Sequence, residues 1–259
     1  MLRSSILCFR LTGVALAMSV SSKNLRDEES RIQEVYSQRH FGSIYSRFDP
    51  AHLFEMQERE RYFLKLLAKS GCRALDKNKI LEVGCGNGEL LRDLIKWGAR
   101  PENTFGIDLI PERIVDAKNL CPQGISIQQG NAAEINFPDQ TFDLVFQSTV
   151  FTSVLDSQIK LRIALEMLRV AKPDGIIFWY DFSVDNPLNK NVKGVGSREI
   201  RRLFKGCDIV LQRITLAPPI ARLLAPYSWL VCYFLSKVPV LCTHYLAAIR
   251  KGQKTNAAS

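Results

Sequence analysis

An acidic residue and three glycines form the pattern with the clearest chemical meaning in this sequence. The stretch ILEVGCGNG, residues 80–88, carries Glu82, followed at alternate positions by Gly84, Gly86 and Gly88. Glycine permits a tight turn and lets another group approach the backbone closely, although it costs more chain entropy than other residues. The spacing differs from the G-x-G-x-x-G of dinucleotide-binding loops, and a negative charge beside the turn disfavours phosphate. We therefore expect this turn to bind a cationic ligand.

A second acid, Asp108, lies 20 positions after Gly88, at the end of the next expected strand. A carboxylate has two acceptor oxygens, and at this place in an α/β sheet it can accept hydrogen bonds from both hydroxyls of a ribose. Glu82 and Asp108 together therefore predict a site for a positively charged nucleoside rather than for a pyrophosphate.

Regular alternation of strands and helices indicates the scaffold that positions these side chains. Strands are expected at residues 79–83, 104–109, 125–129, 142–147 and 175–182. Helices are expected at residues 89–97, from Pro111 onward, and at 157–170 and 197–204. This order predicts a parallel sheet covered on both faces. Two further strands are expected at 209–216 and 244–249, and helices at 27–39 and 50–68 precede the first strand as an N-terminal cap.

Four motifs in order, ILEVGCGNG, FGID, GNAAEINFPD and FDLVFQS, resemble those of class I S-adenosylmethionine-dependent methyltransferases. The resemblance covers about residues 80–182. It implies an α/β, Rossmann-like, doubly wound sheet of seven strands, the last of them antiparallel, with an N-terminal helical cap. The expected division of the chain is a flexible or trimmed extension (1–22), the cap (23–72), the S-adenosylmethionine-binding domain (73–251) and a flexible tail (252–259).

The resemblance also implies roles for individual residues toward S-adenosyl-L-methionine. Glu82 and the loop around it would hold the methionine part, Asp108 would bind the ribose hydroxyls, and Leu109 would pack on the adenine. The remaining residues expected at the cofactor site come from the same loop, the third strand's end and the fourth strand's end: Gly84, Cys85, Gly86, Gly88, Asn131, Ala132, Gln147 and Ser148.

Candidate catalytic groups are few, because the chain has three histidines. Methyl transfer from a sulfonium needs mainly alignment, and a base is needed only if the nucleophile must lose a proton early. Asp181 ends the fifth expected strand at the catalytic edge, and a loop hydrogen bond is its alternative role. His40 and Tyr45 lie with Tyr36 in the aromatic part of the cap, where they line the pocket or pack within the cap.

The charge is concentrated near the carboxyl end. The net charge of the chain is +9, and residues 190–259 hold twelve Lys or Arg against two Asp or Glu. Such an end favours an anionic substrate, an anionic membrane surface or nucleic acid, and an ordinary solvated surface is the further alternative. Nucleic acid is disfavoured because arginines and aromatics do not interleave in a binding pattern. The seven cysteines form no C-x-x-C pair, so neither a metal nor a disulfide is expected, and the cytoplasm is the expected compartment.

Residues 214–243 form an apolar segment interrupted by prolines, too broken to span a bilayer. It reads either as a lid over the pocket or as a surface that contacts a membrane peripherally. Whole-chain similarity to bacterial methyltransferases associated with surface-polysaccharide or lipid-linked sugar gene clusters implies a small-molecule or saccharide acceptor, methylated at oxygen. The alternatives are methylation of a quinone or lipid at the membrane, methylation of nucleic acid, and a non-catalytic cofactor-binding protein.

Overall fold

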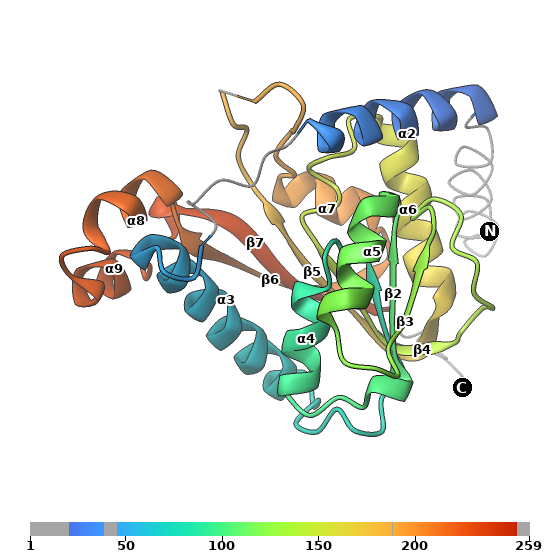
Figure 1. Cartoon of the computed structure of the whole chain (residues 1–259), viewed down its shortest axis with the longest axis horizontal. Coiled ribbons are helices and arrows are strands. Elements are labelled where there is room, and N and C mark those ends of the chain that lie inside the picture. The colour runs from blue at the N-terminus through green and yellow to red at the C-terminus, as the bar shows by residue number, and fades with distance from the viewer. Residues whose placement is uncertain (1–20, 39–45, 188, 253–259) are drawn as a thin grey trace, which may run out of the picture.

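A seven-stranded sheet with helices on both faces forms the centre of the protein (Figure 1). The computed structural model describes residues 21–38, 46–187 and 189–252. The strand order is β3-β2-β1-β4-β5-β7-β6, and β7 pairs antiparallel with both of its neighbours. The strands are β1 (Ile80–Val83), β2 (Thr104–Asp108), β3 (Ser126–Gln129), β4 (Phe142–Ser148), β5 (Ala171–Phe182), β6 (Cys207–Leu216) and β7 (Cys242–Lys251). The predicted fold class is confirmed.

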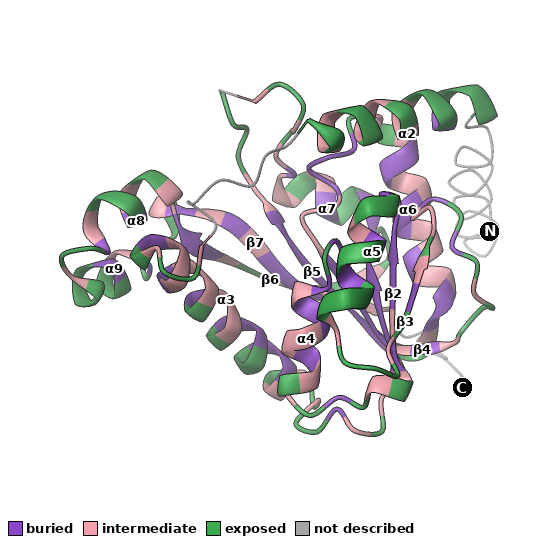
Figure 2. Ribbon diagram, viewed as in Figure 1, coloured by how far each residue is buried: buried purple, intermediate pink, exposed green. Residues whose placement is uncertain are grey.

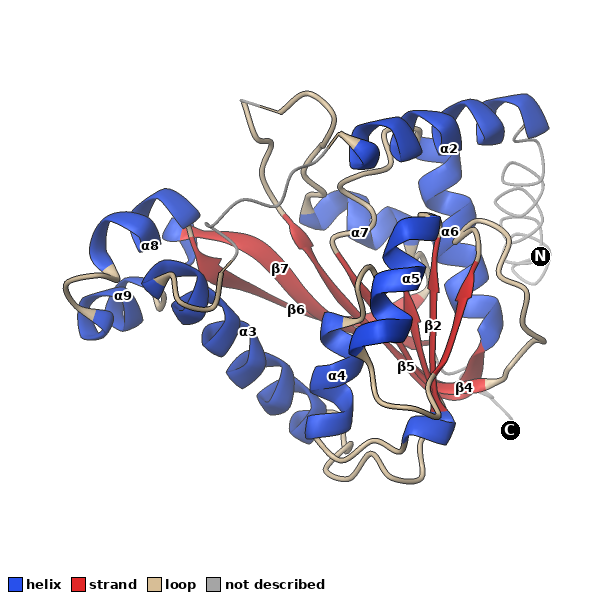
Figure 3. Cartoon of the chain, in the orientation of Figure 1, coloured by secondary structure: helices blue, strands red, loops and turns tan. Residues whose placement is uncertain are grey.

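The helices follow the capping and proline signals of the sequence (Figure 3). The α-helices are α2 (Ser22–Ser37), α3 (Pro50–Lys69), α4 (Glu89–Lys96), α5 (Pro111–Leu120), α6 (Ser157–Val170), α7 (Ser197–Leu203), α8 (Pro218–Leu224) and α9 (Trp229–Leu235), and the short 3-10 helices are η2 (Pro101–Asn103) and η3 (Pro239–Leu241). At the start of α3, the Asp49 carboxylate accepts the His52 backbone N–H at 2.8 Å. Such a cap satisfies a donor that the first helical turn leaves free.

The sheet separates two hydrophobic cores. On one face α2, α6 and α7 pack against the sheet, and Phe151, Met167 and Trp179 are among the fully buried side chains there. On the other face α3 and α4 cover the sheet, and Phe63 of α3 lies against Phe146 of β4 with ring centroids 6.2 Å apart. The parallel strands are therefore buried on both sides, as their continuous apolar sequence predicts.

The part of the chain between β6 and β7 differs most from the sequence-based expectation. Its prolines and apolar residues suggested an irregular insertion, but the structure forms α8, α9 and η3 there, and α8 packs against α3. Figure 1 shows this helical unit beyond the ends of β6 and β7. None of the helices in the described part of the chain combines the length and apolar character that a membrane crossing requires.

Candidate functional site

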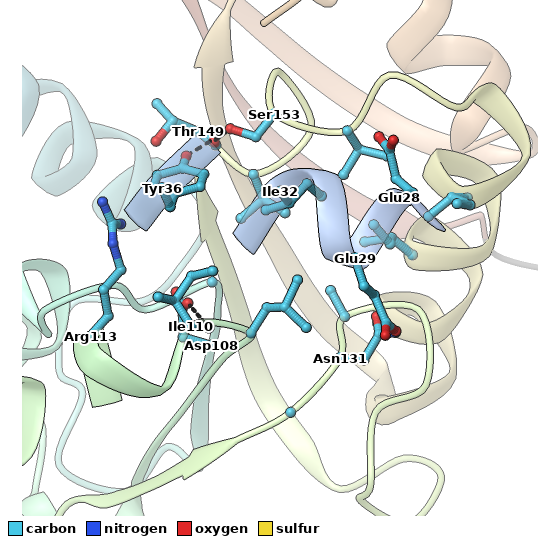
Figure 4. A pocket seen from close by; sticks show the side chains of 18 of the residues that line it. Glu28, Glu29, Ile32, Tyr36, Asp108, Ile110, Arg113, Asn131, Thr149 and Ser153 are labelled. Atoms are coloured by element: carbon cyan, nitrogen blue, oxygen red, sulfur yellow. Dashed lines mark hydrogen bonds between the residues drawn. The ribbon is translucent and has the colours of Figure 1, made fainter. Parts of the chain in front are cut away.

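A pocket lies at the carboxyl ends of the parallel strands, where ligands bind in open α/β sheets. It holds about 750 Å³ of space, including the solvent at its open side. Figure 4 shows α2 crossing over it, opposite the loop after β2. The lining residues are Leu25, Glu28, Glu29, Ile32, Tyr36, Gly84, Asp108, Leu109, Ile110, Arg113, Gly130, Asn131, Ala132, Ser148, Thr149, Val150, Ser153, Val154, Ile159 and Ile163.

The glycine loop between β1 and α4 needs glycine for its backbone and for close packing. Gly84, Gly86 and Gly88 have φ values of +71°, +53° and +77°, in the left-handed region that side chains disfavour. A Cβ on Gly84 would lie 2.3 Å from Val150 Cγ2, and one on Gly88 would lie 2.3 Å from Cys121 Sγ. The close approach expected from the sequence is therefore made, at these two positions, by side chains of the protein itself.

Glu82 is a buried carboxylate at the end of β1, with one oxygen unsatisfied. It is 2% exposed, and its Oε2 has no hydrogen-bond partner within the described residues. Burial raises the pKa of Glu82 well above its ordinary value, although the nearby Arg59 opposes this effect. Arg59 is also engaged elsewhere, because its Nη2 lies 3.5 Å from Glu89 and 3.7 Å from Asp93. A buried acceptor in this state is suited to a cationic donor supplied by a ligand.

Asp108 joins the glycine loop to the start of α5 and faces the pocket. Its Oδ2 accepts the Gly86 N–H at 2.8 Å, and its Oδ1 accepts the Ile110 N–H at 2.9 Å. Each carboxylate oxygen retains further acceptor capacity, and the side chain lines the pocket. The geometry therefore suits the ribose-binding role that the sequence predicts for Asp108.

At the end of β3, Asn131 combines with a residue of the cap. Asn131 Oδ1 accepts the Ala133 N–H at 2.7 Å, and its Nδ2 donates to Glu29 of α2. Asn131, Ala132 and Leu109 all line the pocket, as the resemblance implies for the adenine side. The Glu29 carboxylate lies beside them and adds an acceptor that a purine amino group can donate to.

The helix α2 carries five of the lining residues, of which the sequence analysis considered Tyr36 but not Leu25, Glu28, Glu29 and Ile32 (Figure 4). The Tyr36 hydroxyl lies 2.8 Å from Ser153 Oγ, and Arg31 donates to the Ser153 carbonyl at 2.6 Å. The Arg113 guanidinium lies over the Tyr36 ring, 4.4 Å from its centroid. These contacts fasten the cap to the loop after β4. The charged sequence of α2 gives no signal of this contact, because it has few apolar residues.

Six predicted site residues in the described part of the chain lie outside the pocket lining: Glu82, Cys85, Gly86, Gly88, Gln147 and Asp181. Cys85 is buried in the core formed by α4, α5 and β3. Gln147 is fully buried, its Oε1 accepting the Val150 N–H at 3.1 Å and its Nε2 donating to the Tyr180 carbonyl at 3.4 Å. Asp181 is fully buried at the end of β5, and His40 and Tyr45 lie outside the described residues.

Asp181 accepts backbone hydrogen bonds from the loop that follows β4. Its Oδ2 accepts the N–H groups of Phe151 at 2.9 Å and Thr152 at 3.3 Å, and its Oδ1 accepts that of Phe182 at 3.0 Å. Burial raises the pKa of Asp181 to about 7, while these hydrogen bonds act in the opposite direction. The observed contacts match the loop hydrogen bond that was the alternative to a catalytic role.

The fold and the site together define an α/β protein with a pocket at the carboxyl ends of its parallel strands, and comparison with known proteins shows what it is similar to. Residues 81–179 match the family described as "Methyltransferase domain". The match covers the part of the chain that carries the motifs and identifies it as a methyltransferase domain, in agreement with the S-adenosylmethionine-dependent methyltransferases that the motifs resemble.

Two relatives and one solved structure illustrate the similarity. Over 152 residues the chain is 32% identical to a demethylmenaquinone methyltransferase of Lactobacillus johnsonii, covering 56% of this chain and 57% of the relative. Over 135 residues it is 31% identical to a fatty-acid O-methyltransferase of Mycolicibacterium smegmatis, covering 50% and 46%. The chain thus spans about half the length of these curated relatives. The structure of a putative sarcosine dimethylglycine methyltransferase from Galdieria sulphuraria shares the fold, with a TM-score of 0.59, 17% identity and coverage of 87% of this chain and 98% of that one.

Proposed function

We propose that the protein transfers a methyl group from S-adenosylmethionine to the oxygen of a small, lipid-soluble acceptor. The observation that carries the proposal is the pair of carboxylates around the glycine loop: Glu82, buried with an unsatisfied oxygen, and Asp108, which faces the pocket. The two groups fit the cofactor, because the ligand carries positive charge at its methionine end and vicinal hydroxyls on its ribose.

The chain's own residues would bind the cofactor and keep water from it. Glu82 would face the cationic methionine part, Asp108 would accept from the ribose hydroxyls, and Glu29 with Asn131 would meet the adenine. The bound cofactor supplies a methyl group already activated by the sulfonium charge. Positioning of the acceptor oxygen is then the main contribution of the protein, and such positioning can lower a barrier by about 7–11 kcal/mol in favourable cases.

Support for a lipid-soluble acceptor comes from two directions. The relatives named above are a demethylmenaquinone methyltransferase and a fatty-acid O-methyltransferase, and both names refer to acceptors with long apolar parts. The apolar helices between β6 and β7 also lie at the end of the sheet where β5 ends, which is the end that carries the pocket. The saccharide acceptor implied by the sequence resemblance is the competing outcome of the assay below.

The acceptor class is tested by incubating the full chain with methyl-labelled S-adenosylmethionine and separate pools of quinols, fatty acids, saccharides and RNA, followed by mass spectrometry. We expect label in the quinol or fatty-acid pool. Label in the saccharide or RNA pool alone would overturn the assignment of the acceptor but not of the cofactor. Absence of label from every pool, together with absence of cofactor binding, would overturn the enzyme assignment.

The cofactor site is tested with Asp108→Ala. Loss of charge-assisted hydrogen bonds to the ribose, about 1.5–3 kcal/mol each, should weaken S-adenosylmethionine binding by at least about tenfold. Calorimetric titration measures this, and thermal unfolding establishes that the variant is folded. Asp116→Ala, an exposed carboxylate on α5, is the matched control and should bind as wild type does. Equal affinity of Asp108→Ala and wild type would show that the ribose lies elsewhere.

A further inference from the structure

The segment between β6 and β7, residues 217–241, contains α8, α9 and η3 and is called the apolar lobe below. β5 and β6 both run antiparallel to β7, so they run parallel to each other, and the connection from β6 to β7 leaves the sheet at the edge where β5 ends. The register confirms this placement, because Phe182 pairs with His244 and Leu216 pairs with Cys242. The apolar lobe therefore lies at the edge of the sheet that carries the pocket.

One side of the apolar lobe is packed against the body of the protein. Ala221, Ala225 and Cys232 are buried with Phe54 of α3. The Trp229 ring meets the Phe54 ring edge to face, with centroids 6.0 Å apart. The lobe is thus a fixed part of the fold. This packing buries some of its apolar side chains and leaves others exposed.

Much of the apolar lobe is exposed to solvent, as the exposed colour over parts of α8 and α9 shows (Figure 2), and its exposed residues include large apolar ones. Its 25 residues hold nine of the sixteen large hydrophobic side chains that are exposed in the described part of the chain. These nine are Leu223, Tyr227, Trp229, Leu230, Val231, Tyr233, Phe234, Val238 and Val240. Such a concentration marks an interaction surface, because single exposed hydrophobic residues are common but clusters are not.

The charges around these side chains are all positive within the lobe. Arg222 and Lys237 are its two charged residues, and no Asp or Glu occurs anywhere after Asp208. Lys237 Nζ lies 4.3 Å from the centroid of the Tyr233 ring, and Arg61 of α3 lies 5.3 Å from the same centroid. Cations therefore border the exposed aromatic side chains.

This combination favours a lipid surface over a second copy of the chain. In a twofold dimer the same patch meets itself, and the lobe holds no acid to pair with Arg222 and Lys237 of the other copy. The acids near these two cations, Glu55 and Glu58, belong to α3, where Glu55 is half-buried and Glu58 is buried. An anionic membrane complements the two cations, while apolar side chains enter the acyl boundary and Trp and Tyr rings suit the headgroup level. Seven-residue helices are far too short to cross a bilayer.

We propose that the apolar lobe docks on an anionic lipid membrane, with Leu230 and Phe234 entering the interface and Arg222 and Lys237 contacting lipid headgroups. Docking in this way brings the end of the sheet that carries the pocket, at the carboxyl ends of the parallel strands, toward the bilayer. The docking itself does not depend on methyl transfer, so it can succeed or fail separately from the proposed function.

Vesicle sedimentation with the full chain tests the proposal. The wild type should sediment with vesicles of phosphatidylcholine and phosphatidylglycerol, and much less with phosphatidylcholine alone, with salt weakening the binding. The double variant Leu230→Ser/Phe234→Ser should bind at least about tenfold more weakly, because burial of each side chain contributes about 1.5–3 kcal/mol. Val115→Ser/Leu120→Ser on α5 is the matched control, with exposed fractions of 58% and 54% against 65% and 62% in the lobe.

Tryptophan fluorescence provides a second readout. Trp229 is 38% exposed whereas Trp179 is fully buried, so a blue shift on addition of anionic vesicles should disappear in Trp229→Phe. The proposal is overturned if the wild type binds neither kind of vesicle, or if the α5 control loses binding as much as the lobe variant does. It is also overturned if the wild type is a dimer that Leu230→Ser/Phe234→Ser converts to a monomer, since the lobe would then contact a second copy.

Discussion

Replacing Gly84 with alanine is expected to lower the free energy of unfolding by about 2–5 kcal/mol and to abolish measurable cofactor binding. A left-handed backbone costs a residue with a side chain about 1–2 kcal/mol, and Gly84 has φ +71°. The new methyl group would also lie 2.3 Å from Val150 Cγ2, and such overpacking adds about 1–3 kcal/mol. Relief of the clash must move the glycine loop or the loop after β4, and both line the pocket. Urea unfolding and calorimetric titration with S-adenosylmethionine measure the two effects.

Gly71→Ala separates the backbone effect from the clash. Gly71 has φ +87°, but a Cβ there would meet no atom within 4 Å, so we expect a loss of about 1–2 kcal/mol and unchanged cofactor affinity. The double variant Gly84→Ala/Val150→Ala should recover part of the stability lost in Gly84→Ala, because it removes the colliding methyl group. If Gly84→Ala destabilises no more than Gly71→Ala, close packing at Gly84 is not important.

The parts of the fold that the sequence predicts are those in which local signals agree with the tertiary structure. Pro111 occupies the first turn of α5, Asp108 ends β2, and β4 reads as a continuous apolar run. In each case the same residues determine the element and its place in the sheet. For this reason the positions of Glu82, Asp108 and Asn131 relative to the strand ends could be inferred from motif order, whereas the seven strands with the last one antiparallel came from the family resemblance.

The parts that could not be predicted depend on contacts between distant segments. Glu29 reaches the pocket only because α2 lies across it, and its partner Asn131 is more than a hundred positions away. The helices of the apolar lobe likewise depend on packing against Phe54. Leu25 and Ile32 of α2 pack against the core. The contacts of Glu29 and Tyr36 with distant side chains add to this packing in orienting the helix.

Two buried carboxyl groups at the strand ends show why residue type alone does not distinguish a ligand-binding residue from one that holds a loop in place. Glu82 and Asp181 are both acids at the carboxyl edge, and burial raises the pKa of each. Glu82 keeps an unsatisfied oxygen, whereas both oxygens of Asp181 accept backbone N–H groups. A ligand can therefore complete the environment of Glu82, while the environment of Asp181 is already complete.

Asp181→Ala is expected to lower the free energy of unfolding above pH 7 by about 3–5 kcal/mol, since it leaves three buried backbone N–H groups without their acceptor. The loop after β4 would lose its fixed position, so cofactor affinity should fall as well. Asp181→Asn retains one acceptor oxygen and should lose less. Urea unfolding of the three proteins measures the effect, and a loss below about 1 kcal/mol in Asp181→Ala would contradict the supporting role.

The pH dependence of stability in wild type and Asp181→Asn shows whether the pKa of the Asp181 carboxyl is raised by burial or is ordinary. In the unfolded chain Asp181 titrates near pH 4, and in the folded protein its pKa is about 7. Between these values the folded state binds more protons, so this group's contribution to stability is complete below about pH 4 and is lost as the pH rises through 7. Asp181→Asn lacks this pH-dependent contribution to stability. Glu82 and the other carboxyls whose pKa is raised contribute equally in both proteins. The free energy of unfolding of wild type minus that of Asp181→Asn should therefore decline from about pH 4 to 7 and then become constant. A difference that stays flat or rises over this range would contradict the raised pKa. It would mean that Asp181 is ionised throughout and that the hydrogen bonds from its backbone donors outweigh the effect of burial.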